Sequence, residues 1–184
     1  MLVGGTDVAA QGWNIVTSGP ATVTYGADYV QLETSTMMSA TTGGHLLLSY
    51  PDAFPANTPF KLEVKLLRLS TTQHNQFDAP VAIMGSFTPT FGNQNDRAEM
   101  IYLDTAALGW ADDLQSFAAA INGSYHTYVL SVDAAKVATV TIDGTTALTR
   151  NNFTSNGTIA IGDQTNDANF DGTMRISSVR LLCL

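Results

Sequence analysis

Hydrophobic and polar residues alternate along several short runs of this chain, as they do in strands that bury one face of a sheet. In the clearest run, residues 60–69, every second residue from Phe60 to Leu66 is apolar and the residues between them are charged. Turn-forming residues separate the runs, and the mostly polar stretch 86–97 is expected to form a loop. The expected strands are residues 13–16, 22–25, 29–33, 45–49, 60–69, 81–87, 98–103, 127–132, 138–142, 158–161 and 173–182.

Two details of the pattern predict local geometry. Asp143 and Gly144 lie just after an alternating run and tolerate positive φ, so they predict a tight hairpin turn. In the last expected strand, the apolar residues fall out of phase after Ile176. A β-bulge near Ser177 and Ser178 would restore the phase.

One segment has helical rather than strand periodicity. In residues 111–121, the apolar residues Leu114, Phe117, Ala118 and Ile121 fall on one stripe, and acidic residues precede them. The segment is therefore expected to be a short helix that crosses between two sheets.

Composition restricts the class of protein. The chain has 184 residues, of which 45% are hydrophobic and 13% charged, so we expect a single globular domain over residues 1–184. The formal net charge of -8 disfavours nucleic acid and anionic membrane surfaces as partners. Cys183 is the only cysteine, which excludes an intrachain disulfide. The start of the chain does not read as a signal peptide, and no apolar run is long enough for membrane insertion.

The last third of the chain carries a resemblance to a known superfamily. Residues 125–133, 140–144, 159–163 and 170–182 read YHTYVLSVD, VTIDG, IAIGD and FDGTMRISSVRLL. In this order they resemble the closing strands of laminin G-like domains in the concanavalin A-like lectin and glucanase superfamily. The first motif has Tyr125 where that pattern prefers Trp. The resemblance implies an all-β fold, a two-sheet antiparallel jelly-roll sandwich, here with one short helix.

Two groups of enzymes with a similar fold use residue patterns that this chain lacks or matches only in part. Glycanases similar to this superfamily use two Glu close together on one strand, but Glu33, Glu63 and Glu99 are each without an acid two residues later. Alginate lyases of similar fold use Arg-x-Glu-x-Arg, of which Arg97 and Glu99 match only half. A non-catalytic scaffold is therefore favoured, with a divergent polysaccharide hydrolase or lyase centred on Arg97, Glu99 and His126 as an alternative.

Five residues are candidates for ligand binding. Arg97 and Glu99 are expected on the outer face of one strand with Glu63 nearby, and Trp110 and Tyr102 offer aromatic faces on which sugar rings stack. The alternative is that the charges pair across a solvated sheet and the aromatic rings pack in the core.

A loop near the C-terminus is the candidate metal site. Asp163, Asp167, Asn169 and Asp171 supply oxygen atoms at a spacing that calcium loops use, so calcium is the candidate cofactor. The alternative is a turn in which Asp and Asn bond their own backbone while Phe170 enters the core.

These observations lead to three hypotheses. The first is a non-catalytic, lectin-like module that binds a glycan or cell-surface polysaccharide or mediates adhesion. The second is a virion structural or receptor-binding protein, from a phage tail or a capsid decoration, for which a homo-oligomer is expected. The third is the divergent hydrolase or lyase. All three imply an extracellular or virion-associated location.

Overall fold

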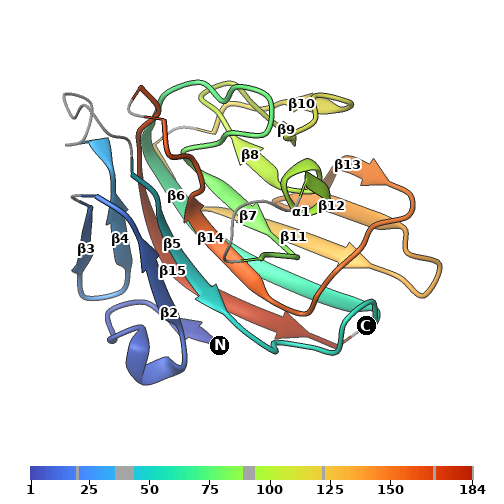
Figure 1. Cartoon of the computed structure of the whole chain (residues 1–184), viewed down its shortest axis with the longest axis horizontal. Coiled ribbons are helices and arrows are strands. Elements are labelled where there is room, and N and C mark those ends of the chain that lie inside the picture. Colours follow the sequence, from blue (N-terminus) through green and yellow to red (C-terminus); the bar gives the residue numbers. More distant parts are fainter. Residues whose placement is uncertain (20, 36–43, 89–93, 122, 168, 184) are drawn as a thin grey trace.

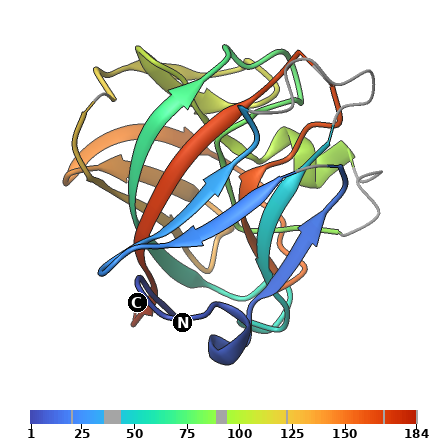
Figure 2. The same ribbon diagram turned by 90° about the vertical axis from the view of Figure 1, so that its left-hand side faces the viewer.

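The alternating runs form two antiparallel sheets that lie face to face (Figures 1 and 2). The structure is a computed structural model that describes residues 1–19, 21–35, 44–88, 94–121, 123–167 and 169–183. The eight-stranded sheet has the order β13 (Thr145–Arg150), β12 (Ala138–Ile142), β11 (His126–Val132), β6 (Phe60–Thr71), β15 (Gly172–Leu182), β4 (Val30–Glu33) and β3 (Thr22–Tyr25), and β1 (Leu2–Val3) pairs with β15. The seven-stranded sheet has the order β10 (Ser116–Ala118), β9 (Ala107–Trp110), β8 (Ile101–Leu103), β7 (Ala82–Met84), β14 (Ile159–Asp163), β5 (Leu46–Tyr50) and β2 (Asn14–Thr17).

The main core lies between the two sheets. From β6, the alternating residues Leu62, Val64 and Leu66 point inward and are at most 1% exposed. From the seven-stranded sheet, Ile83 and Ile161 belong to the same apolar cluster. Burial of one such side chain contributes about 1.5–3 kcal/mol, so the alternation noted in the sequence is the main source of the stability of the sandwich. The predicted two-sheet, all-β architecture is confirmed.

The seven-stranded sheet is also apolar on its outer face. Leu47, Met84 and Ala160 form a second buried cluster there, together with Phe87 and Met100. Phe87 and Met100 lie on either side of the only α-helix in the described residues, α1 (Gln94–Ala98). The segment that contains α1 therefore helps to cover this face, and the sheet has two buried sides.

Both local details predicted from the sequence are confirmed. Asp143 and Gly144 have φ values of 48° and 83°, and they connect β12 to β13. The pairing of β15 with β6 shifts register between Ile176 and Ser178, which is the expected bulge. The bulge keeps Val179 in the core.

The predicted helix at residues 111–121 is wrong. The chain there forms a hairpin in which β10 pairs antiparallel with β9, and Asp113 occupies its turn with a φ of 62°. Leu114 is 81% exposed while Ile121 is 1% exposed, so the residues of the apparent stripe do not share a face. The free edge of β9 offers backbone hydrogen bonds to Ser116–Ala118, and this pairing overrides the local helical pattern.

Other elements differ from expectation as well. The described residues do contain one short α-helix, but it lies at Gln94–Ala98. That segment was expected to be the end of a loop and the first residue of the strand 98–103. The strands β1, β9 and β13 were not expected, and a 3₁₀ turn, η1 (Ala9–Gln11), precedes β2. Among the described residues, no helix combines the length and apolarity needed to span a membrane.

A buried carboxyl group links the two sheets. Asp163, at the end of β14, is 1% exposed, and its Oδ2 lies 2.5 Å from the hydroxyl of Thr34, which directly follows β4. Its Oδ1 accepts a hydrogen bond from the Thr165 amide, and the Thr34 hydroxyl accepts one from the Gly172 amide. Burial raises the pKa of Asp163 well above its usual range, although Thr34 and Thr165 oppose that rise.

The protonated form of Asp163 satisfies every partner in this group. Its O–H can donate to the Thr34 hydroxyl, and that hydroxyl can then donate to the Gly172 carbonyl oxygen, which lies 3.1 Å away. An Asn side chain also places an acceptor oxygen beside a donor group, so it mimics the neutral acid apart from one additional N–H.

The hairpin predicts the outcome of two substitutions. Leu114→Ala is expected to change the free energy of unfolding by less than about 0.5 kcal/mol because that side chain is exposed. Ile121→Ala is expected to cost about 2–5 kcal/mol because it leaves a cavity in the core. Urea unfolding measures both values, and equal losses at the two positions would instead agree with a helical stripe.

Asp163 predicts a dependence of stability on pH. A carboxyl whose pKa is raised by folding stabilises the protein most below its unfolded pKa, near 3.8, and that contribution is lost as the pH rises through the folded pKa. Asp163→Asn is therefore expected to gain stability over the wild type as the pH increases from 4 to 7. Asp163→Ala, which loses the hydrogen bonds, is expected to be about 1–3 kcal/mol less stable than Asp163→Asn at every pH. Denaturant unfolding of all three proteins across this range is the measurement, and a constant difference between wild type and Asp163→Asn would contradict the raised pKa.

Candidate functional site

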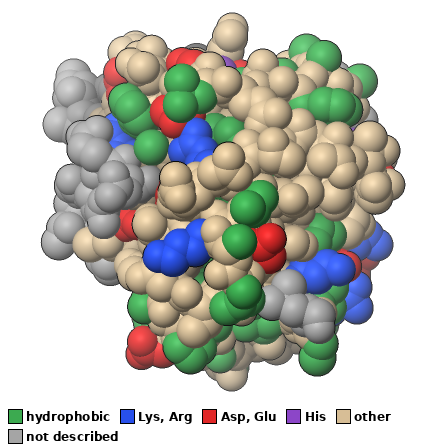
Figure 3. All heavy atoms as spheres, turned by 90° about the vertical axis from the view of Figure 1, so that its right-hand side faces the viewer, with side chains coloured by type: hydrophobic (Ala, Val, Ile, Leu, Met, Phe, Trp, Pro, Cys, Tyr) green, Lys and Arg blue, Asp and Glu red, His purple; other side chains and the backbone are tan. Residues whose placement is uncertain are grey.

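A pocket of about 570 Å³ opens where an edge of one sheet meets an edge of the other. The β9–β10 hairpin forms one side and β13 the other, and the last residue of α1 and the residue after it complete the wall. We call it the edge pocket; its lining residues are Ala98, Glu99, Trp110, Asp112, Leu114, Gln115, Thr149, Arg150 and Asn151. Figure 3 shows this side of the molecule, where most side chains are uncharged and the charged ones are scattered.

Arg150, at the end of β13, joins the three segments of the edge pocket. Its Nη2 pairs with Asp112 Oδ2 at 2.5 Å, and its Nη1 donates to the Ala98 carbonyl oxygen at 2.9 Å. The guanidinium carbon lies 4.8 Å from the centre of the Trp110 ring, which is a cation–π contact. The guanidinium group is therefore fixed on three sides.

Hydrogen bonds close the same edge between the sheets. Trp110 Nε1 donates to the Thr149 carbonyl oxygen at 3.3 Å, and the Thr149 amide donates to Gln115 Oε1 at 2.8 Å. Trp110 was predicted to be a stacking platform, but it is 1% exposed and contacts Arg150 with its ring. It forms the base of the pocket rather than an open aromatic face.

Glu99 lies in the wall of the edge pocket with its carboxylate partnered. Both carboxylate oxygens accept hydrogen bonds from Thr154, from the amide at 3.0 and 3.1 Å and from the hydroxyl at 3.1 Å. Burial raises the pKa of Glu99, and the bonds from Thr154 and the charge of Arg150 reduce that rise. The group is thus an acid held in one orientation.

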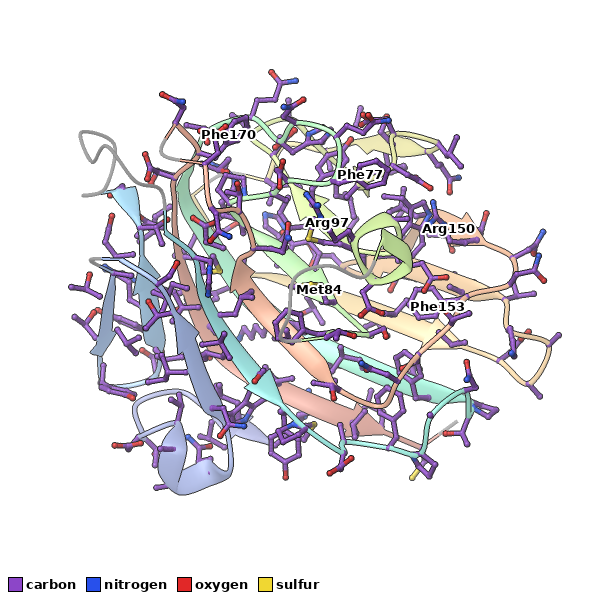
Figure 4. All side chains as sticks on the ribbon, viewed as in Figure 1. Phe77, Met84, Arg97, Arg150, Phe153 and Phe170 are labelled. Carbon is purple, nitrogen blue, oxygen red and sulfur yellow. The ribbon has the colours of Figure 1, made fainter. Side chains whose placement is uncertain are left out.

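The expectation that Arg97 and Glu99 share an outer strand face is wrong. Arg97 belongs to α1 instead of a strand, so the two side chains leave the backbone in different directions. Arg97 donates to the Phe77 carbonyl oxygen and pairs with Asp78 at 2.7 Å. Figure 4 shows Arg97 and Arg150 on opposite sides of α1.

Glu63 lies far from the edge pocket in the fold. It is on the outer face of β6, in the eight-stranded sheet, opposite Arg180 of β15. The two side chains form an ion pair with hydrogen bonds. This arrangement is the cross-strand charge pairing that was the alternative reading of this residue.

Tyr102 is covered by other side chains. It is 3% exposed, and the ring of His74 stacks on it with 3.5 Å between ring centres. The two nitrogens of His74 lie 2.5 Å from Asp104 and 2.8 Å from Asp113. Gly109 makes room for the Tyr102 hydroxyl, because a Cβ there would lie 2.5 Å from it. Burial, followed by the charges of Asp104 and Asp113, raises the pKa of Tyr102.

His126, the remaining catalytic candidate, bonds within its own hairpin. Its Nδ1 lies 2.6 Å from Asp143 Oδ2, and Asp143 Oδ1 accepts from the Thr127 amide at 2.8 Å. Burial acts to raise the pKa of Asp143, but Thr127 and His126 outweigh it and hold that pKa below its usual range. The ring nitrogens of His126 thus bond Asp143 and the hydroxyl of Ser124, and neither of these partners is Arg97 or Glu99.

The candidate calcium residues use several of their oxygens within the protein. Both oxygens of Asp163 are bonded, and Asp167 Oδ1 accepts from the amide and the side chain of Asn169. Asp171 is 4% exposed and its Oδ2 has no hydrogen-bond partner among the described residues. Burial, together with the charge of Glu33, raises the pKa of Asp171.

This arrangement does not fit a preformed calcium site. No group of three or more His, Cys, Asp or Glu in the described part of the chain can hold a metal ion. The alternative reading of the loop is partly correct: Asp167 bonds its neighbours as in a turn, whereas Phe170 is half-buried and lies outside the core (Figure 4).

Sequence reasoning therefore found two residues of the edge pocket, Trp110 and Glu99, and missed the others. Arg150, Asp112 and Gln115 carry no motif. They meet because two edges from different sheets lie together, and sequence spacing holds no signal of that contact.

Comparison with known proteins identifies the fold. No protein-family model matches this chain, and no curated protein matches its sequence. Among solved structures, the carbohydrate esterase vb_24B_21 from the Shiga toxin-encoding bacteriophage phi24B is similar with a TM-score of 0.61 and 18% identity, over 95% of this chain and 91% of that one. The exoplasmic/lumenal domain of VIP36 in its Ca²⁺- and mannose-bound form has a TM-score of 0.60 and 11% identity, over 94% and 83%.

A polysaccharide lyase has the same architecture. The alginate lyase AlgAT5, of polysaccharide lyase family 7, is similar with a TM-score of 0.56 and 14% identity, over 90% of this chain and 82% of the lyase. Lectins and carbohydrate-active enzymes thus share this architecture, and identities this low carry information on fold alone. Together with the two-sheet topology, these similarities show that the chain has the concanavalin A-like jelly-roll fold.

Proposed function

We propose that this chain is a non-catalytic carbohydrate-binding module that takes a neutral glycan in the edge pocket. The observation that carries the proposal is the pocket itself, which has a volume of about 570 Å³ and is lined by several polar side chains around a fixed guanidinium group. Pockets of this size with a few oriented polar groups are typical of small-ligand sites.

The lining suits the surface of a sugar. Sugar hydroxyls both donate and accept hydrogen bonds, and the exposed amide of Asn151 and the side chain of Gln115 offer both functions. Leu114 is 81% exposed at the rim, where it presents an apolar surface to the C–H side of a sugar ring. A polar wall beside an apolar rim matches a ligand that has both kinds of surface.

The charges favour a neutral ligand. The lining contains the acidic residues Glu99 and Asp112 and one basic residue, Arg150, whose guanidinium is already bonded to Asp112 and Ala98. The whole chain carries a formal charge of -8. An acidic glycan would meet repulsion from both the pocket and the protein, whereas a neutral one would not.

The similar structures support a carbohydrate ligand. The VIP36 domain was solved with mannose, the phage protein is a carbohydrate esterase, and AlgAT5 is an alginate lyase. A binding role is favoured over catalysis because Glu99 is bonded to Thr154 and Asp112 to Arg150. Neither carboxylate is left free beside the other, as a pair of glycosidase acids would be.

A second candidate function places the same binding activity on a virus particle. The similarity to a bacteriophage protein favours a receptor-binding or decoration role, which would make the chain virion-associated. If the protein is cellular instead of viral, the same glycan binding would serve adhesion outside the cell. A stable symmetric oligomer in light scattering is expected for the virion role, and a monomer at high concentration counts against it.

Calcium is not part of the proposed binding site, and its effect on glycan binding is to be tested by adding or removing it. The VIP36 domain binds Ca²⁺, but here Asp163 and Asp167 already use carboxylate oxygens within the protein. Binding of the glycan is therefore expected to be the same with EDTA as with added calcium. A loss of binding in EDTA would restore the metal prediction for Asp163, Asp167, Asn169 and Asp171.

Affinity electrophoresis and calorimetry test the proposal. The protein is expected to bind at least one of mannan, xylan, galactan and β-glucan, and to bind alginate and polysialic acid less well. Asn151→Ala and Leu114→Ala are each expected to weaken binding by about threefold to tenfold, the value of one hydrogen bond or a small apolar contact. Both residues are exposed, so folding is expected to be intact.

Asn14→Ala is the matched control. Asn14 is also an exposed Asn, but it lies in β2, at the opposite edge of the seven-stranded sheet. Its substitution is expected to leave binding unchanged. Absence of binding to every glycan would refute the proposal, and release of reducing ends or unsaturated sugars would favour the hydrolase or lyase hypothesis instead.

A further inference from the structure

A second pocket, of about 270 Å³, lies near the other side of α1. Asp78 and Arg97 line it from one side, and residues 164–167 line it from the loop after β14. None of these residues lines the edge pocket. Arg97 and Asp167, which the sequence assigned to separate candidate sites, therefore line the same pocket.

One atom in this wall lacks a partner. Gln164 is 4% exposed, and its Oε1 has no hydrogen-bond partner among the described residues. A buried amide oxygen without a donor costs about 1–3 kcal/mol, and a rotation of the Gln164 side chain toward the pocket that it lines would let a ligand O–H group relieve that cost. Sugar hydroxyls are donors of this kind.

The charges in the second pocket resemble those of the edge pocket. Arg97 is paired with Asp78, and Asp167 adds a second negative charge. Burial raises the pKa of Asp78, and the charge of Arg97 opposes that effect. With one basic and two acidic residues, this lining also disfavours an anionic ligand and suits a neutral polyol.

The two pockets lie close together across one turn of helix. Arg97 lines the second pocket, and the next residue, Ala98, lines the edge pocket and accepts a hydrogen bond from Arg150. Figure 4 shows Arg97 and Arg150 on either side of α1. A helix with its side chains is about 10–12 Å wide, so an oligosaccharide of a few residues can reach from one pocket to the other.

We propose that the second pocket is a further subsite for the same neutral glycan, whose chain crosses α1 between the two pockets. This inference rests on the proposed function of the edge pocket. It implies that the protein recognises an internal stretch of a polysaccharide rather than only a terminal sugar. The edge pocket then provides the basal affinity, and the second pocket adds affinity only for chains long enough to reach it.

The experiment measures affinity against chain length. Manno-, xylo- and gluco-oligosaccharides of increasing length, from the monosaccharide to the hexasaccharide, are titrated into the wild-type protein. Affinity is expected to rise by about tenfold once the chain spans α1, equivalent to one or two added hydrogen bonds. The same titrations are made with variants of each pocket.

Gln164→Leu is the first variant, since it replaces the unpartnered amide by an apolar side chain of similar size. Asp167→Ala is the second, and because Asp167 is exposed it guards against a folding defect at the buried position. Both are expected to keep the affinity for short oligosaccharides and to lose the gain for long ones. Asn151→Ala, in the edge pocket, is expected to weaken binding at every length, and thermal unfolding checks that each variant is folded.

The outcomes separate the two proposals. Binding of oligosaccharides without any gain from chain length overturns the second subsite but leaves the edge pocket as the glycan site. If the gain in affinity with chain length persists in both Gln164→Leu and Asp167→Ala, the second subsite is likewise overturned and the edge pocket remains the glycan site. Failure of every oligosaccharide to bind overturns the proposed function and the subsite with it.

Discussion

The guanidinium of Arg150 holds together the part of the molecule on which its proposed activity depends. β13 ends one sheet and the β9–β10 hairpin ends the other, and backbone pairing does not connect them. Arg150 connects them through Asp112 and through the ring of Trp110. A cation–π contact of this kind contributes about 1–2 kcal/mol when it is partly desolvated, and the planar guanidinium also fixes direction. Together with the hydrogen bonds of Thr149 to Trp110 and Gln115, this side chain fixes the two edges against each other at the edge pocket.

The outer face of the seven-stranded sheet explains why the candidate sites lie around α1. That face is apolar, and Phe87 and Met100 pack on it from the segment that contains α1. A ligand therefore meets the covering segment rather than the sheet. The depressions that remain are at the borders of this segment, and consecutive residues, Arg97 and Ala98, line two of them. The segment that contains α1 therefore covers the apolar outer face of the sheet and also forms the surface that a glycan can contact.

The sequence predicted those parts of the fold that depend on local period and turn chemistry. The alternation in β6, the Asp143-Gly144 turn and the bulge after Ile176 all follow from neighbours along the chain. The predicted helix at 111–121 failed because an apolar stripe over so few turns also fits a hairpin, and the free edge of β9 decided the outcome. The local hydrophobic pattern is a poor predictor of secondary structure where a nearby sheet edge offers backbone hydrogen bonds.

The candidate site was less predictable than the fold. Trp110 and Glu99 were selected for their chemistry, but their surroundings depend on Arg150 and Thr154, which are distant in sequence. Asp163 was selected as a metal ligand because carboxylates suggest cations. Its actual partner is the hydroxyl of Thr34 from the other sheet, a contact that only the packed sandwich creates. Functional and structural carboxylates have the same appearance in a sequence.

The position of β15 has a consequence for how the protein is made. In sequence order this strand comes after the other described strands of the eight-stranded sheet, yet it lies in the interior of that sheet, between β6 and β4. While the ribosome is still adding the residues before Gly172, β3 and β4 have no neighbour that joins them to the rest of that sheet. The eight-stranded sheet therefore stays open until β15 has been made, and during that interval its unpaired strand edges can associate with other chains.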